Sequence, residues 1–316
     1  MIYVNLLIII LCIIFIHELG HYSVARLFKT SVTDFSVGFG KVLYQFKDKN
    51  QTNWKFSIVP LGGFVKIKGW ESIFKNSKQV DKAHDSFQNL SLIKKVCVLL
   101  AGSAFNIISA WLCIFFIFFF FGIVSFAPIV GGIIDKSSAS TNDIREGDII
   151  ANINNQPIEN FSDIADAIDG ADRIIIEIIR GNTLIAKEFD LTFNKDTGKN
   201  IIGIYSTDTP EVDKYALWQS LKKSLTFIPG YYDSMFTYLN KSYESKTLTQ
   251  DLAGPIGMVK MADKLMLDKI GGVLFIFVSI SLFVGLFNLI PIPLLDGGHI
   301  VYFTIRSMFS DYLPAV

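Results

Sequence analysis

The residues HELGH (17–21) stand at the end of an apolar run, MIYVNLLIIILCIIFI (1–16). On a helix, side chains four residues apart lie on one face, so His17 and His21 can point at one metal ion. Glu18 lies about 100° around the helix from His17. Its carboxylate would therefore lie beside a metal-activated water and not on the metal. This pattern predicts a metal site in which Glu18 acts as a general base.

The position of this motif strengthens the prediction, because ionisable groups at membrane depth usually line a cavity or pair with something. The apolar run before the motif lacks the basic start and the small-residue cleavage site of a signal peptide. We therefore interpret it as a retained membrane-spanning helix. The alternative is that the three polar residues only mark the end of that helix at the membrane surface.

Three segments are long and apolar enough to span a bilayer, at about 2–22, 97–121 and 271–292. Hydrophobic residues make up 51% of the chain, and the mean hydropathy is +0.42. Both values are typical of a membrane protein with a soluble part. The formal net charge is zero, so we expect no nucleic-acid partner. Three cysteines in or beside apolar runs predict buried thiols and no disulfide framework.

The distribution of charged residues between the spans predicts the orientation of the chain in the membrane. The segment 23–96 holds 13 Lys and Arg against 5 Asp and Glu, whereas 122–270 holds 15 against 21. The positive-inside rule places the shorter, basic segment in the cytoplasm and the long acidic segment outside. The cytoplasmic ends of the first and third spans then lie on the same side of the membrane.

The segments between the spans differ in character. Residues 30–40 and 54–67 look extended, and the second stretch is interrupted by a turn signal at 60–63 (PLGG). Residues 126–208 combine short β-rich runs with one helical candidate, 161–170, which predicts a compact α+β module. Residues 211–250 have near-helical spacing broken at Pro229. They are either an amphipathic helix at the outer membrane surface or a simple connector. We expect four regions: 1–125, 126–208, 209–270 and 271–316.

A catalytic zinc usually takes three protein ligands, so a third is needed. Asp296, just past the third span, is the acidic residue that this topology allows to approach His17 and His21. Pro291 and Pro293 should break the helix before it, and Gly297 and Gly298 permit close backbone approach. Asn288 could donate to an oxyanion or to the substrate backbone, or it could be an interhelical amide. His299 could belong to the site or be structural.

Together these motifs resemble the site-2 proteases, specifically the bacterial regulator-of-sigma-E group. The resemblance covers nearly the whole chain in family order. Its further elements are 38–40 (GFG), 60–66 (PLGGFVK), 101–102 (AG) with Asn106, 254–257 (GPIG) and 288–298.

The resemblance implies that His17, His21 and Asp296 bind Zn2+ and that Glu18 is the catalytic base. It implies that Gly62, Gly63 and Phe64 belong to a membrane-reentrant hairpin that pairs with substrate as an added strand. It further implies that 126–208 is one PDZ domain, with 145–150 (REGDII) as its signature.

The expected protein is thus a multi-pass enzyme of the bacterial inner membrane, with its active site toward the cytoplasm and the PDZ domain outside. Its expected substrates are single-span membrane proteins already shortened on the outside, such as anti-sigma factors or signal-peptide remnants. The PDZ domain would act there as a size filter.

The chain departs from the family in two places. Ser103 stands where proline often follows Ala-Gly, and the usual fourth spanning helix is not seen before Val316. The second departure leaves an alternative open, a truncated and catalytically silent adaptor that binds partners through its PDZ domain. A metal transporter fits less well, because the polar groups cluster at one end of the spans.

Overall fold

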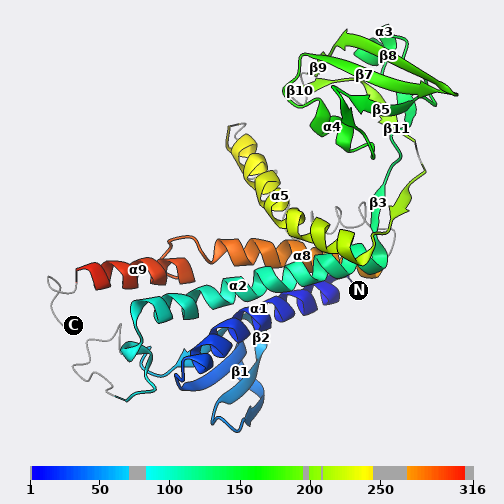
Figure 1. The fold of residues 1–316 in the computed structure, drawn as a ribbon. Helices are drawn as coiled ribbons and strands as arrows, with labels where there is room; N and C mark the ends of the chain where they lie inside the picture. Colours follow the sequence, from blue (N-terminus) through cyan, green and yellow to red (C-terminus); the bar gives the residue numbers. More distant parts are fainter. Residues whose placement is uncertain (1, 71–82, 195–198, 208, 245–268, 310–316) are drawn as a thin grey trace. The chain divides into compact units, whose positions relative to one another are not determined.

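The computed structural model describes residues 2–70, 83–194, 199–207, 209–244 and 269–309 (Figure 1). The chain divides into two compact units. The membrane unit consists of Met1–Phe120 and Ala216–Val316, and the inserted unit is Phe121–Tyr215.

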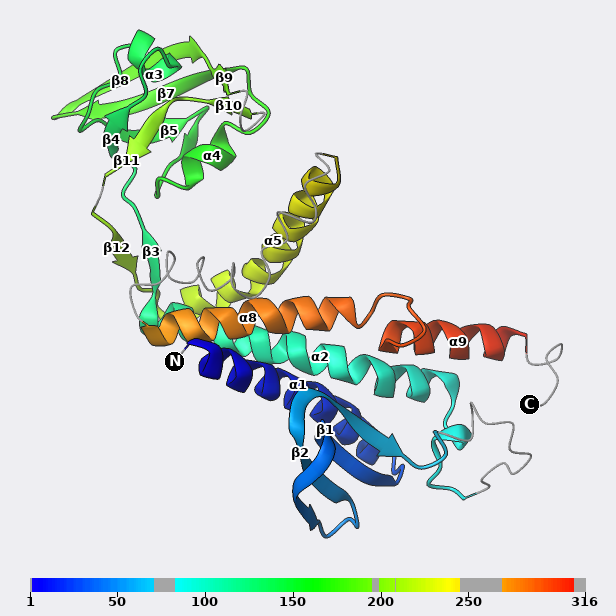
Figure 2. The ribbon, with the colours of Figure 1, turned by 180° about the vertical axis from the view of Figure 1, so that it is seen from behind.

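Three helices form the body of the membrane unit: α1 (Ile2–Leu27), α2 (Leu92–Phe116) and α8 (Lys269–Phe287). A single π-helical turn, Ile117–Phe121, extends α2. The helices lie side by side in both views, and α2 packs against α1 and α8 (Figures 1 and 2). All three are long and apolar enough to cross a membrane, as expected. The chain is therefore a membrane protein.

The third span ends earlier than the expected residue 292. Helix α8 stops at Phe287 because Pro291 has no N–H and its ring would clash with the carbonyl four residues before it. A tight connector follows, in which the Gly297 amide donates to the Asn288 carbonyl at 2.8 Å. Helix α9 (Asp296–Met308) then begins at the predicted third ligand. The sequence pattern did not predict this helix.

A long hairpin, β1 (Val32–Lys47) and β2 (Asn53–Ile67), follows α1. The turn between the two strands lies at 48–52, where the Asp48 carboxylate accepts the amides of Asn50 and Thr52 at 2.8 and 2.9 Å. The residues of the turn signal, 60–63, lie inside β2, but the chain does reverse its direction there. Residues 53–56 run in the same direction as 34–37, whereas 63–66 run in the opposite direction, and Gly62, with φ of 85°, lies in this reversal.

Because both strands bend, the hairpin folds back on itself into four rows: 44–47, 53–56, 34–37 and 63–67. Phe35, for example, pairs with Trp54 on one side and with Val65 on the other. The Tyr22 hydroxyl of α1 donates to Asp48 at 3.1 Å and ties the hairpin to that helix. Row 63–67 is an outer edge, with no further strand partner in the described parts of the chain.

Helix α5 (Leu217–Glu244) covers most of the segment with near-helical spacing. Pro229 lies inside the helix, which bends in its middle in Figure 1. The hydroxyls of Tyr231 and Tyr232 donate to the Ser279 and Leu282 carbonyls of α8 at 3.0 and 3.1 Å. These bonds hold α5 against α8. The family motif at 254–257 lies outside the described residues.

The inserted unit is an α+β module, as expected. Its central sheet is antiparallel, in the order β6 (Gln156–Pro157), β5 (Ile149–Ile153), β7 (Arg173–Arg180) and β8 (Thr183–Asp190). Three smaller pairs accompany it: β3 (Ile123–Ser125) with β12 (Glu211–Asp213), β4 (Val130–Ile133) with β11 (Ile204–Ser206), and β9 (Thr192–Asn194) with β10 (Lys199–Ile201). Its helices are the short α3 (Ser138–Thr141) and α4 (Asp163–Ala167).

The core of this module is mostly isoleucine, including Ile150, Ile153 and Ile176, each fully buried. Arg180 donates two hydrogen bonds to the Asp148 carboxylate, at 2.7 and 2.8 Å. Burial by itself raises the pKa of Asp148, but the bonds from Arg180 and from the Arg145 amide outweigh it, so the pKa lies below its ordinary value. Asp148 thus stays ionised and ties its loop to β7.

Candidate metal centre

The two histidines of the motif lie one turn apart on α1, where this helix crosses α2 at very short range. A Cβ added at Gly20 would run into the Ala101 carbonyl of α2. A Cβ added at Gly102 would collide with both imidazole rings and would lie only 2.7 Å from His17 Nε2. Glycine at these positions therefore lets the helix backbones approach and leaves room for the rings.

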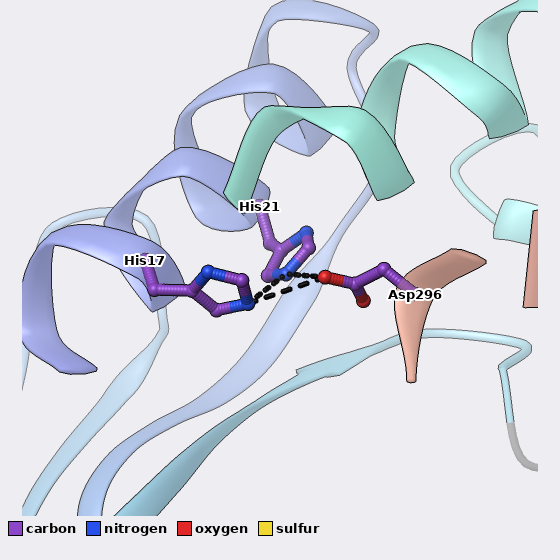
Figure 3. Close-up of side chains that lie close together, drawn as sticks. All are labelled: His17, His21 and Asp296. Carbon is purple, nitrogen blue, oxygen red and sulfur yellow. Dashed lines mark hydrogen bonds and ion pairs between the residues drawn. The ribbon is translucent and has the colours of Figure 1, made fainter. Parts of the chain in front are cut away.

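The structure fixes the orientation of each ring through its Nδ1 atom. His21 Nδ1–H donates to the Val98 carbonyl of α2 at 2.8 Å. A carbonyl oxygen only accepts, so the His21 proton is on Nδ1 and the Nε2 lone pair is free. His17 Nδ1 lies 3.3 Å from the side-chain amide of Asn106, also on α2. Both Nε2 atoms lie beside Gly102 of α2 and face Asp296 (Figure 3).

Asp296 reaches the two Nε2 atoms from the first turn of α9. Its Oδ2 atom lies 3.2 Å from His17 Nε2 and 3.4 Å from His21 Nε2, and the two Nε2 atoms are 3.2 Å apart (Figure 3). The three side chains are only 11–15% exposed. Residues far apart in the sequence thus form one compact group with three candidate ligand atoms.

The dimensions of this triangle suit a small metal ion. Tetrahedral zinc with bonds of about 2.0–2.1 Å places its ligand atoms about 3.3 Å apart, close to the three distances observed. Asp296 Oδ2 is also buried, and apart from the two imidazoles it has no hydrogen-bond donor in the described residues. A cation shared with the neutral rings would stabilise this buried carboxylate. Two imidazole nitrogens and a carboxylate oxygen are a typical ligand set of catalytic zinc sites. The residues present therefore fit the metal.

A cavity of about 370 Å³ opens beside the triangle, and Glu18 lines it. Row 63–67 of the hairpin forms part of its wall, and a Cβ added at Gly63 would lie 3.0 Å from Glu18 Cγ. The hairpin edge thus passes directly beside the candidate base. A carboxylate, three candidate metal ligands and an outer strand edge meet in one cavity, an arrangement suited to metal-assisted attack on an extended peptide.

The other predicted site residues lie around the same cavity. Asn288, Gly62 and Phe64 line it, and the stacked ring of Phe39 supports Phe64. His299, whose role the sequence left open, lines it as well and meets the edge of the Trp70 ring. Trp70 and Val98 were not predicted. Their contribution depends on how separate segments pack, which residue spacing does not encode.

Comparison with known proteins finds one peptidase family over nearly the whole chain. The model of peptidase family M50 matches residues 5–315. A relative from Campylobacter jejuni is 33% identical over 96% of this chain and 83% of its own length. A relative from Rickettsia conorii is 29% identical over 98% of this chain and 90% of its own length. Each of these two relatives is named, provisionally, as a zinc metalloprotease.

Two solved structures that are similar to part of this chain are PDZ domains. The PDZ domain of an SdrC-like protein from Listeria innocua aligns with 26% of this chain and 96% of its own length. The identity is 22% and the TM-score is 0.24.

Proposed function

The chain belongs to peptidase family M50, which confirms the resemblance to site-2 proteases, and we propose that it is a zinc-dependent intramembrane endopeptidase. The observation that carries the proposal is the triangle of His17, His21 and Asp296, with ligand atoms 3.2–3.4 Å apart. The triangle is built on an apolar helix long enough to cross a membrane.

Bound by these three side chains, zinc would supply a Lewis acid that polarises the scissile carbonyl and makes water acidic near neutral pH. Glu18, in the same cavity, accepts the proton of the attacking water. It then returns the proton to the leaving amine as the peptide bond breaks. Asn288 donates to the carbonyl oxygen as negative charge develops on it.

The substrate binds as an extended strand along row 63–67 of the hairpin. A helical substrate shields its own carbonyls, so it must unwind before attack. The free edge at Gly63 and Phe64 offers backbone hydrogen bonds to replace those that the helix loses. That this edge lies beside Glu18 supports the assignment, because pairing there holds the chain extended at the base.

We assign as substrates single-span membrane proteins that a first protease has shortened on the outside, of the anti-sigma-factor or signal-peptide-remnant type. The enzyme then lies in the bacterial inner membrane with its metal site toward the cytoplasm. The excess of positive charge in 23–96 supports this orientation. The inserted unit would be a single PDZ domain on the outer side that filters substrates by size.

A silent adaptor is the competing function, and it needs no metal. The buried convergence of two imidazoles and a carboxylate, with ligand atoms 3.2–3.4 Å apart, argues against it, because partner binding through the inserted unit does not require such a cluster.

Changing Glu18→Gln tests the enzyme directly, because the amide keeps the size of the side chain but cannot take up the proton. We expect zinc to remain bound and cleavage of a single-span substrate in membranes to fall at least about 100-fold, the scale of general acid–base catalysis. Cleavage at the wild-type rate with zinc bound would refute the mechanism.

A further inference from the structure

Asn106 is fully buried in the middle of α2. Of the two polar atoms in its side-chain amide, one has a hydrogen-bond partner among the described residues. The Nδ2 group lies 3.3 Å from His17 Nδ1. The Oδ1 atom is buried and has no hydrogen-bond donor in the described part of the chain. A buried carbonyl oxygen without a donor is costly, and in an apolar helix it calls for an explanation.

The tautomer of His17 that metal binding requires explains why a carbonyl oxygen is buried at Asn106. His17 Nε2 faces Asp296 and His21, so it must offer its lone pair to the metal, and the ring proton then lies on Nδ1. In the amide orientation above, two donors would face each other. At His21 the same requirement is met by an acceptor, the Val98 carbonyl.

We propose that Asn106 is a positioning residue for the metal centre. Turned by 180° about its last side-chain bond, the amide places Oδ1 against His17 Nδ1–H and holds the ring with its lone pair toward the metal. Ser103, one turn earlier on α2, has a buried hydroxyl that also lacks a partner among the described residues. It is a candidate acceptor for the turned Nδ2 group.

The backbone around Asn106 is suited to this role. Its carbonyl accepts the Ser281 hydroxyl of α8 at 3.0 Å, so the residue is fixed between two helices. Val98 and Asn106 lie eight residues apart on α2 and serve the two histidines, which lie four apart on α1. One helix thus supplies both acceptors that orient the ligands of the other.

Zinc affinity, measured by competition with a chelator, tests the proposal without relying on activity. Asn106→Leu keeps the size of the side chain but removes the acceptor, and we expect zinc to bind 10–100-fold more weakly. Asn106→Asp restores an acceptor and should bind within a few-fold of wild type. If the leucine variant does not accumulate in membranes, Asn106→Ala is measured in the same way.

Ser281→Ala is the matched control, because it removes the helix-to-helix bond at the same residue and leaves the amide in place. Its zinc affinity should match wild type. Unchanged affinity in Asn106→Leu, equal losses in the leucine and aspartate variants, or an equal loss in Ser281→Ala would each overturn the proposal. The role of Asn106 rests on the proposed zinc enzyme, but different results would refute these two proposals. A wild-type chain without zinc refutes the enzyme, whereas zinc held equally by wild type and Asn106→Leu refutes only this role.

Discussion

Gly102 shows how closely single residues set the geometry of the metal centre. It has no side chain, yet it determines where both imidazoles can lie, because any Cβ there would occupy the space of the rings. The preceding Ala101 faces Gly20 in the same way. The crossing of α1 and α2 therefore belongs to the site as much as the ligands do.

We predict that Gly102→Ala weakens zinc binding at least about tenfold, because a methyl group there forces the rings out of position, and a misplacement of about 1 Å in a site is costly. Gly230→Ala is the control. It adds the same methyl group to α5, another helix of the membrane unit, where the new Cβ would meet no atom within 4 Å. The interpretation fails if both variants hold zinc equally well under chelator competition.

Among single residues, the sequence predicts those site residues whose positions depend only on the geometry of one helix. The spacing of His17, Glu18 and His21 is a property of any helix. The topology of the spans allowed Asp296 to approach them, and the family resemblance assigned it as a ligand. The acceptors at Val98 and Asn106 depend on the register between α1 and α2, which no local pattern encodes. Asn106 did carry a signal, since a polar amide inside an apolar span is costly.

Among the elements, the hairpin most directly links fold to substrate. It has two outer rows, 44–47 and 63–67, and of these only the second lines the cavity beside Glu18. A substrate strand therefore has a defined place to bind. The hairpin was predicted, and the turn signal at 60–63 marks the reversal inside β2. The turn between the two strands was not predicted, because it depends on Asp48 accepting two backbone amides.

Disulfide cross-linking can identify the substrate-binding edge. In a Glu18→Gln chain lacking the three native cysteines, we predict that Val65→Cys cross-links to a cysteine beside the cleavage site of a mapped substrate. Phe46→Cys, on the opposite outer row, is the matched control and should give at least tenfold less product. Equal yields at the two positions, measured on gels, would mean that the substrate does not pair along row 63–67.

For the whole molecule, the main feature is that the proposed metal site brings together the first and the last helices of the membrane unit. The inserted unit and α5 are encoded between the histidines on α1 and Asp296 on α9. The three spans and the α+β module could be predicted from hydropathy and composition. Helix α9 and the early end of α8 could not, because they depend on the tight connector around Pro291 and on the Gly297 amide bonding to Asn288.

The zinc content of the purified chain tests this account most directly. Because the three ligand atoms converge on one point, we predict about one zinc per chain. Asp296→Ala, which removes the ligand from the far end of the sequence, should lose the metal. Leu294→Ala, an exposed neighbour on the same connector, should keep it. A wild-type chain that holds no zinc, or an Asp296→Ala chain that holds as much as wild type, would contradict the account.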